Sequence, residues 1–237
     1  MASGQPRSTE RTALVVGASK GLGLEWVRCY LAHGWRVVAT WLEPSPALDA
    51  LQADYADRLA VHPLDIMDTP AVRALRSTLE DCSIDVLHIV AGVFQASMAP
   101  IWEQPDTEIL RVLKTNAIAG VHLAELFATR VPPGGCFAFT SSGMGSMARN
   151  DRGDVDLYRI SKAALNMLVR SFGARHAGEG KAAVLFCPGW AKTDMGGPDA
   201  TVEAADSVAG MYRWIEQAAE DPAGPQFREY SGEIVPW

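Results

Sequence analysis

Short apolar runs alternate along the chain with segments in which apolar residues recur every three or four positions. The apolar runs predict strands at 12–16, 35–41, 58–62, 86–90, 136–140 and 182–186, with a last short extended segment at 226–230. The periodic segments predict helices at 21–33, 69–81, 156–176 and 202–219, and two helical stretches within 106–130. The strand segments are continuous apolar runs, as expected for a parallel sheet covered by helices on both faces.

This alternation predicts a single α/β domain over residues 12–237. A polar lead-in at 1–11 precedes it, and we expect that segment to be flexible. The proline-containing stretches at 44–46 and 221–225 are interpreted as loops and not as domain boundaries. A length of 237 residues is ordinary for one α/β domain.

Composition excludes several classes of partner. The formal net charge of -7 argues against nonspecific binding to nucleic acid or to an anionic membrane, because both require a basic surface. No apolar run approaches the roughly 20 residues that cross a bilayer. The four cysteines, Cys29, Cys82, Cys136 and Cys187, form no C-x-x-C pair, and the histidines are dispersed, so we expect reduced thiols, no metal site and a cytoplasmic location.

A glycine-rich turn follows the first predicted strand and opens the first predicted helix. Its sequence is Gly17-Ala18-Ser19-Lys20-Gly21-Leu22-Gly23. Such a turn lets the backbone approach a pyrophosphate, and the helix N-terminus supplies N–H groups and partial positive charge. The same residues also fit G-x-S-x-G, the nucleophile elbow of α/β-hydrolases, with Ser19 as nucleophile. That alternative is disfavoured because only residues 1–11 precede the strand and the last histidine is His176.

Tyr158 and Lys162 are four residues apart on a predicted helix and therefore share one face. A nearby ammonium, together with an oxidised nicotinamide, would stabilise the phenolate and lower the pKa of the tyrosine. The spacing alone is also common on solvated helices. Other polar or glycine positions, however, follow the ends of several predicted strands, and ligands of open α/β sheets bind at those ends.

Taken together, these motifs resemble the short-chain dehydrogenase/reductase family over essentially the whole chain. The motifs are the glycine turn, Asp65, Ala91-Gly92, Asn116, Ser142, Tyr158-x-x-x-Lys162, and Pro188-Gly189 with Thr193. Segments 141–146, 158–166 and 188–197 and the Pro236-Trp237 end resemble the C-factor and sniffer-type carbonyl reductases. The resemblance implies a Rossmann-type doubly wound parallel sheet. It also implies hydride transfer between a nicotinamide cofactor and a small or medium carbonyl or alcohol.

The resemblance also implies a role for each matching residue. Tyr158 is the acid or base, Lys162 lowers its pKa, Ser142 hydrogen-bonds the carbonyl oxygen, and Asn116 anchors a water in a proton relay. The implied cofactor-binding residues are Gly17, Ser19, Lys20, Gly21, Leu22 and Gly23 near the pyrophosphate, Asp65 and Ile66 at the adenine, Ala91 and Gly92, Tyr158 and Lys162 at the ribose, and Pro188, Gly189 and Thr193 at the carboxamide.

The sequence departs from the family pattern in three places. Val90 stands where the family usually has an asparagine that braces the sheet. The interval from Ser142 to Tyr158 is long, and its charged part predicts an exposed loop at 149–156. At the end of the second strand, Trp41 replaces the carboxylate of NAD-specific members, and Leu42 replaces the arginine of many NADP-specific ones.

The remaining expectations concern cofactor choice, substrate and assembly. We expect NADP(H), with Lys20 meeting the 2′-phosphate, although Glu43 could favour NAD(H). An apolar substrate with one polar handle is expected from the candidate lining residues Phe94, Met98, Met144, Met147, Trp190 and Met195. Relatives form dimers or tetramers through the helices around Asn116 and Tyr158, and monomers exist. The alternative function is a nucleotide-binding signalling or sensor protein with little turnover.

Overall fold

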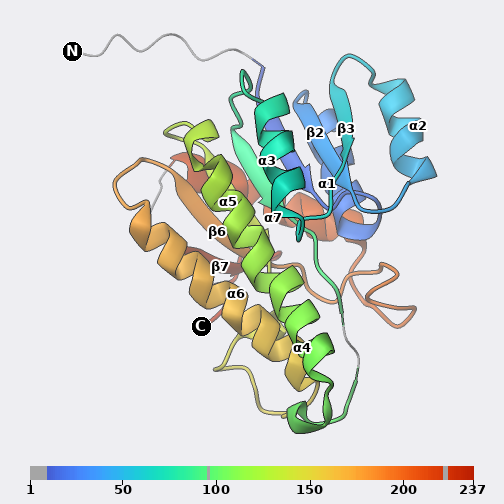
Figure 1. The fold of residues 1–237 in the computed structure, drawn as a ribbon, viewed down its shortest axis with the longest axis vertical. Helices are drawn as coiled ribbons and strands as arrows, with labels where there is room; N and C mark the ends of the chain where they lie inside the picture. Colours follow the sequence, from blue (N-terminus) through green and yellow to red (C-terminus); the bar gives the residue numbers. More distant parts are fainter. Residues whose placement is uncertain (1–9, 95–96, 221–223) are drawn as a thin grey trace.

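Seven parallel strands form one twisted sheet at the centre of the molecule (Figure 1). The computed structural model describes residues 10–94, 97–220 and 224–237. The strands are β1 (Thr12–Val16), β2 (Arg36–Trp41), β3 (Leu59–Pro63), β4 (Val86–Ile89), β5 (Cys136–Thr140), β6 (Ala182–Cys187) and β7 (Gln226–Glu229), in the spatial order β3-β2-β1-β4-β5-β6-β7. The chain therefore runs outward from β1 to one edge, returns to the centre at β4 and continues to the other edge.

Helices cover both faces of this sheet. They are α1 (Gly21–Ala32), α2 (Pro46–Asp54), α3 (Thr69–Thr78), α4 (Asp106–Leu113), α5 (Gly120–Phe127), α6 (Asp156–Arg175) and α7 (Ala204–Glu220). Figure 1 shows α3, α5 and α6 in front of the sheet, with α1 and α7 behind it. This arrangement confirms the predicted Rossmann-type, doubly wound α/β fold.

The continuous apolar pattern of the strands is explained by two cores, one on each face. Successive residues of a strand point to opposite faces. In β1, Leu14 and Val16 belong to the core beneath α3, α5 and α6, while Ala13 and Val15 belong to the core beneath α1 and α7. Residues Ala13 to Val16 of β1 are all buried in these two cores, which explains why this part of the strand is apolar on both faces.

The structure corrects the loop predicted at 44–46. Ser45 is the N-cap of α2, its hydroxyl accepting from the Leu48 amide at 3.3 Å, and Pro46 is the first helical residue. Proline is compatible with this position because the first-turn amide has no helical partner. The prolines that suggested a loop therefore begin a short helix. The predicted lead-in at 1–11 and the loop at 221–225 fall largely on residues outside the described ranges.

A second departure lies in the helical region at 106–130. Between α4 and α5 the backbone takes a π-helical turn, Lys114–Ala119, which contains Asn116. Such turns break the regular hydrogen-bond ladder and are frequent at functional sites. Within the described ranges, no helix is long and apolar enough to cross a membrane. The thiols of Cys29, Cys82, Cys136 and Cys187 are free, and Cys136 and Cys187 are buried as predicted.

Candidate active site

A cleft of about 420 Å³ opens beyond the carboxyl ends of the central strands. It lies where the strand order reverses between β1 and β4, which is the usual ligand position in such sheets. Most of the residues predicted to bind the cofactor line it, namely Gly17, Ser19, Lys20, Gly21, Leu22, Gly23, Asp65, Ile66, Ala91, Gly92, Tyr158, Lys162, Pro188 and Thr193. The structure thus brings together residues from the ends of four strands and from helix α6.

The glycine turn fits a close approach of the backbone to a phosphate. Gly17 has a φ of +91°, and a Cβ there would lie 2.7 Å from the Ala91 Cα. A Cβ on Gly23 would lie 2.0 Å from the Gly17 carbonyl oxygen, so α1 can begin this close to the turn only with glycine. Lys20 precedes α1 in an extended conformation and offers no side-chain cap. The first amides of α1 are therefore available to an anion.

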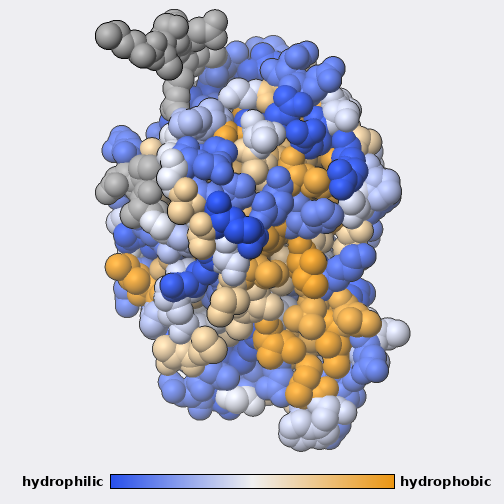
Figure 2. All heavy atoms as spheres, turned by 60° about the vertical axis from the view of Figure 1, so that its left-hand side comes forward, coloured by the Kyte–Doolittle hydropathy of each residue, from blue (hydrophilic) through white to orange (hydrophobic). Residues whose placement is uncertain are grey.

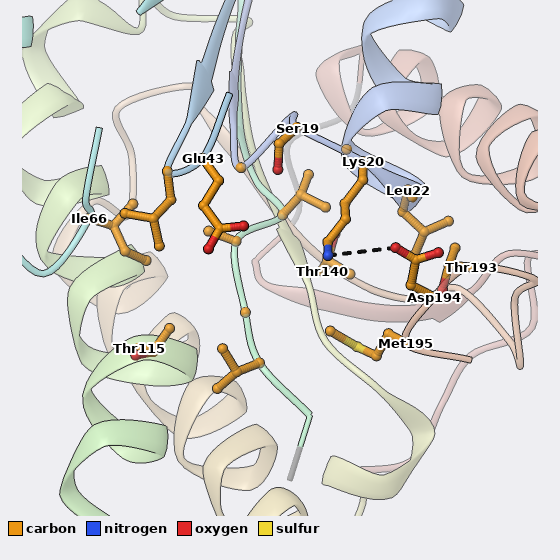
Figure 3. A pocket seen from close by; sticks show the side chains of 18 of the residues that line it. Ser19, Lys20, Leu22, Glu43, Ile66, Thr115, Thr140, Thr193, Asp194 and Met195 are labelled. Atoms are coloured by element: carbon orange, nitrogen blue, oxygen red, sulfur yellow. Dashed lines mark ion pairs between the residues drawn. The ribbon is translucent and has the colours of Figure 1, made fainter. Parts of the chain in front are cut away.

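Acidic side chains border the other end of the cleft. Asp65 accepts a hydrogen bond from the Met67 amide at 2.8 Å through Oδ1, which fixes its carboxylate after β3. Figure 3 shows the Glu43 side chain reaching into the cleft between Ser19 and Ile66. Leu42 lines the same part of the cleft and is 65% exposed. The end of β2 therefore presents one apolar and one acidic side chain, with no arginine.

Tyr158 and Lys162 lie on the buried face of α6, as the sequence predicts. The Lys162 Nζ donates to the Thr140 carbonyl oxygen at 3.0 Å and lies 5.7 Å from the centre of the Tyr158 ring. Burial lowers the pKa of Lys162 to about 8. Burial also raises the pKa of Tyr158 to about 12, against a smaller lowering effect from a hydrogen bond with Ser142. In the protein alone, burial therefore outweighs the lowering of the tyrosine pKa that the sequence predicts.

Ser142 faces Tyr158 from the end of β5. Its hydroxyl shares a hydrogen bond with the Tyr158 phenol and accepts from the Met144 amide at 3.1 Å. The Phe94 ring packs edge-on against the Tyr158 ring, with centroids 4.8 Å apart. The hydroxyl groups of Ser142 and Tyr158, which come from different elements, therefore lie together near the apolar ring of Phe94.

The Asn116 side chain is buried and braces the segment after β4. Its Oδ1 accepts from the Val93 amide at 2.8 Å, and its Nδ2 donates to the Val93 carbonyl at 2.9 Å and to the Ser161 hydroxyl at 3.0 Å. A Cβ on Gly92 would lie 3.2 Å from Asn116 Oδ1 and 3.5 Å from Lys162 Nζ. Asn116 Oδ1 and Lys162 Nζ therefore both border the space that a side chain at position 92 would occupy, and glycine leaves this space free.

The segment after β6 closes the remaining side. Pro188 is held by the Ser207 hydroxyl, which donates to its carbonyl oxygen at 2.7 Å. Gly189 adopts a φ of +72° and packs against Tyr230, outside the lining of the cleft.

Figure 3 shows Lys20 directed toward Asp194, and the two charged groups lie 3.6 Å apart. Both side chains are exposed, so this ion pair is weak and can rearrange.

Sequence reasoning identified only part of the lining. Of the six candidate substrate residues, Met195 lines the cleft and Phe94 contacts Tyr158, whereas Met98, Met144, Met147 and Trp190 are not among the lining residues. Lining residues that it missed include Arg111, Thr115 and Met67. Arg111 and Thr115 are spaced by one helical turn before Asn116, a signal that could have placed them there. In the described ranges, no cluster of three or more His, Cys, Asp or Glu residues could hold a metal ion.

Comparison with known proteins agrees with this geometry. Residues 11–203 match the family model for short chain dehydrogenases. The chain is 38% identical over 168 residues to the C-signal of Myxococcus xanthus, a match that covers 70% of this chain and 100% of that protein.

Solved structures agree as well. A Burkholderia multivorans structure with bound NADP, assigned to the short-chain dehydrogenases/reductases, is 38% identical, with a TM-score of 0.92 and coverage of 96% of this chain and 100% of that one. A carbonyl reductase from Pseudomonas aeruginosa in complex with NADP is 34% identical, with a TM-score of 0.89 and coverage of 97% and 100%. The resemblance to C-factor and sniffer-type carbonyl reductases is thereby confirmed, and the chain belongs to the short-chain dehydrogenase/reductase family.

Proposed function

We propose that this chain is a carbonyl reductase or alcohol dehydrogenase that uses NADP(H) and acts on a small or medium, largely apolar substrate. The observation that carries the proposal is the meeting of the Tyr158 and Ser142 hydroxyls, with Tyr158 and Lys162 lining one cleft. Two hydroxyl donors aimed at one point suit a carbonyl oxygen, where negative charge develops as a hydride arrives.

When bound, a nicotinamide would supply the hydride for reduction and would accept it in the reverse direction. Ser142 donates a hydrogen bond to the substrate oxygen and holds it beside Tyr158. Tyr158 gives its phenolic proton to that oxygen in reduction and removes the proton in oxidation. Lys162 and the segment braced by Asn116 hold the ribose side of the site and supply a route for the proton to return to Tyr158.

The electrostatics of the site keep Tyr158 protonated near neutral pH, which is the form that reduction requires. Because burial raises the pKa of Tyr158 to about 12, the phenol holds its proton and is ready to donate it. The oxidative direction requires the phenolate, which the protein alone disfavours. The positive charge of an oxidised nicotinamide next to Tyr158 would lower that pKa. We therefore expect oxidation to have a higher pH optimum than reduction.

The preference for NADP(H) rests on two supports. NADP is bound in close structural neighbours from Burkholderia multivorans and Pseudomonas aeruginosa. In this chain the end of β2 presents Trp41 and Leu42, neither of which repels a 2′-phosphate. Glu43 opposes the preference, since its carboxylate lines the cleft. Lys20 must leave Asp194 if it is to meet the phosphate.

The test is a spectrophotometric screen of ketones, aldehydes and quinones with NADPH and with NADH. We expect oxidation of NADPH with at least one apolar carbonyl, and slower turnover of the same substrate with NADH. Binding of both cofactors without turnover on any member of the panel would contradict the proposed activity.

That negative result is what the alternative function predicts. A nucleotide-binding signalling or sensor protein would use the same cleft without chemistry, and the similarity to the Myxococcus xanthus protein named C-signal supports this alternative. The retained hydroxyl pair and the buried Lys162 favour catalysis, because binding alone does not require an acid at this place.

We also propose a homodimer or homotetramer and a cytoplasmic location. Helices α4 and α6 pack side by side, and Figure 2 shows apolar side chains gathering on the lower part of the surface, where Figure 1 places these helices. Exposed apolar residues of α4, of the π-helical turn after it and of α6 are Leu110, Ile118, Ile160 and Met167. Analytical ultracentrifugation tests the assembly.

Free thiols at Cys29, Cys82, Cys136 and Cys187 suit a reducing compartment such as the cytoplasm.

A further inference from the structure

Asn166 is a buried amide on the catalytic helix that the proposed mechanism does not use. It lies on α6, four residues after Lys162 and eight after Tyr158, so the three side chains share one face. Only 4% of its surface is exposed, and it does not line the cleft. A buried amide needs partners for both its oxygen and its nitrogen.

Its two partners flank the catalytic serine. The Asn166 Oδ1 accepts from the Ser141 hydroxyl at 2.6 Å, and its Nδ2 donates to the Gly145 carbonyl oxygen at 3.0 Å. Ser142 lies between these two attachment points. The turn also packs directly on the helix, since a Cβ on Gly145 would lie 2.8 Å from the Lys162 carbonyl carbon.

We infer that Asn166 is a positioning residue that fixes Ser142 relative to Tyr158 and Lys162. One side chain ties both ends of the turn at 141–145 to the helix that carries the other two groups. Ser142 follows a strand and the others lie on a helix, so their spacing depends on this link together with packing and the hydrogen bond from Lys162 to Thr140. The inference deepens the proposed function and rests on it, because Ser142 has to contact the substrate for its position to matter.

The amide is suited to this task because it is both an acceptor and a donor. Aspartate has the same shape and still accepts from Ser141, but its second oxygen would face the Gly145 carbonyl and repel it. Leucine has a similar volume and makes neither bond. Asn166→Asp therefore breaks one attachment and Asn166→Leu breaks both.

The experiment compares kcat, KM and cofactor dissociation constants for wild type, Asn166→Asp and Asn166→Leu, each alone and combined with Ser142→Ala. Asn150→Leu is the matched control, because Asn150 is an exposed asparagine of the nearby loop. We expect kcat to fall about 10- to 100-fold in both Asn166 variants, since misplacement of a reacting group by about 1 Å has effects of this size. The dissociation constant of NADPH should change less than about twofold, since Asn166 does not line the cleft.

The combined variants distinguish an effect of Asn166 on the position of Ser142 from a contribution that is independent of Ser142. If Asn166 acts through Ser142, adding either Asn166 change to Ser142→Ala should lower kcat by less than about threefold more. Full additivity would overturn the inference, and so would a wild-type kcat in Asn166→Leu. Loss of folding in both Asn166 variants would also overturn it, because it would assign the residue to stability. Absence of turnover in the wild-type protein would instead contradict the proposed function itself.

Discussion

The Nζ of Lys162 donates a hydrogen bond to the main-chain oxygen of Thr140 at 3.0 Å. Thr140 is the last residue of β5, and the chain continues from it into Ser141 and Ser142. The bond therefore joins the helix that carries Tyr158 to the strand that carries Ser142. It also leaves a buried ammonium with a neutral acceptor, and burial lowers the pKa of Lys162 to about 8.

Lys162 gives the fold a measurable dependence on pH. The folded protein releases this proton near pH 8, whereas an unfolded chain keeps it up to the ordinary value of 10.5. The unfolded state thus binds more protons in this interval, and stability rises with pH. From pH 8 to 9.5 the free energy of unfolding should gain about 2 kcal/mol from this group, at about 1.4 kcal/mol for each pH unit.

Urea unfolding of wild type and Lys162→Met across this pH range checks the expectation. Relative to wild type, Lys162→Met should lack the gain of about 2 kcal/mol, and Lys114→Met, at an exposed lysine of the π-helical turn, should keep it. Burial raises the pKa of the four cysteines, which opposes the gain equally in all three proteins, so the difference from wild type is the quantity to compare. Titration of Tyr158 does not interfere below about pH 10, because burial raises its pKa. A parallel pH dependence in wild type and Lys162→Met would show that the Lys162 pKa is not lowered.

Neighbouring serines should differ sharply in their importance for catalysis. Ser142→Ala removes a hydrogen bond to the substrate oxygen that strengthens in the transition state, so kcat and kcat/KM should fall together. Ser141→Ala removes the hydroxyl that donates to Asn166, but the hydrogen bond from Asn166 to Gly145 stays in place. We therefore expect kcat to fall much less than in Ser142→Ala. Steady-state kinetics on both variants decides the point. A larger loss in Ser141→Ala would place the wrong serine at the substrate.

Three substitutions test how the cleft selects its cofactor. Lys20→Ala should weaken use of NADPH selectively, Leu42→Arg should strengthen it, and Glu43→Gln should also strengthen it by removing a carboxylate from the lining. The measurement is kcat/KM with NADPH and with NADH for each variant. Equal losses with both cofactors in Lys20→Ala would rule out Lys20 as the group that reads the 2′-phosphate.

The sequence predicted the sheet well because its information is local. Each residue of β1 from Ala13 to Val16 is buried in one of two cores, so this part of the strand had to be apolar. The glycine turn could also be predicted from the sequence, because the close approach of Gly17 to Ala91 requires glycine. The placement of Tyr158 and Lys162 on one helix face also followed from their spacing, whereas their selection as candidates rested on the resemblance to the family. In each case a short-range pattern carried the physical requirement.

What the sequence did not show depends on contacts between distant segments. Nothing local indicates that Asn166 spans the turn around Ser142. The pKa of Tyr158 also depends on burial by the whole fold, and here burial dominates over the neighbouring charge that the spacing suggested. The sequence did not reveal helix α2 because proline occurs both in loops and at the first position of helices. Pro44 and Pro46 therefore did not distinguish the two structures.

Tyr158→Phe provides the most direct test of the proposed chemistry. The substitution removes only the phenolic oxygen, so the ring keeps its packing against Phe94. The measurement is the rate of NADPH oxidation with the best carbonyl of the screen, alongside the dissociation constant of NADPH by fluorescence titration. We predict a rate about 10²- to 10⁴-fold lower with cofactor binding retained, which is the usual contribution of a general acid. A rate within a factor of two of wild type would contradict the account.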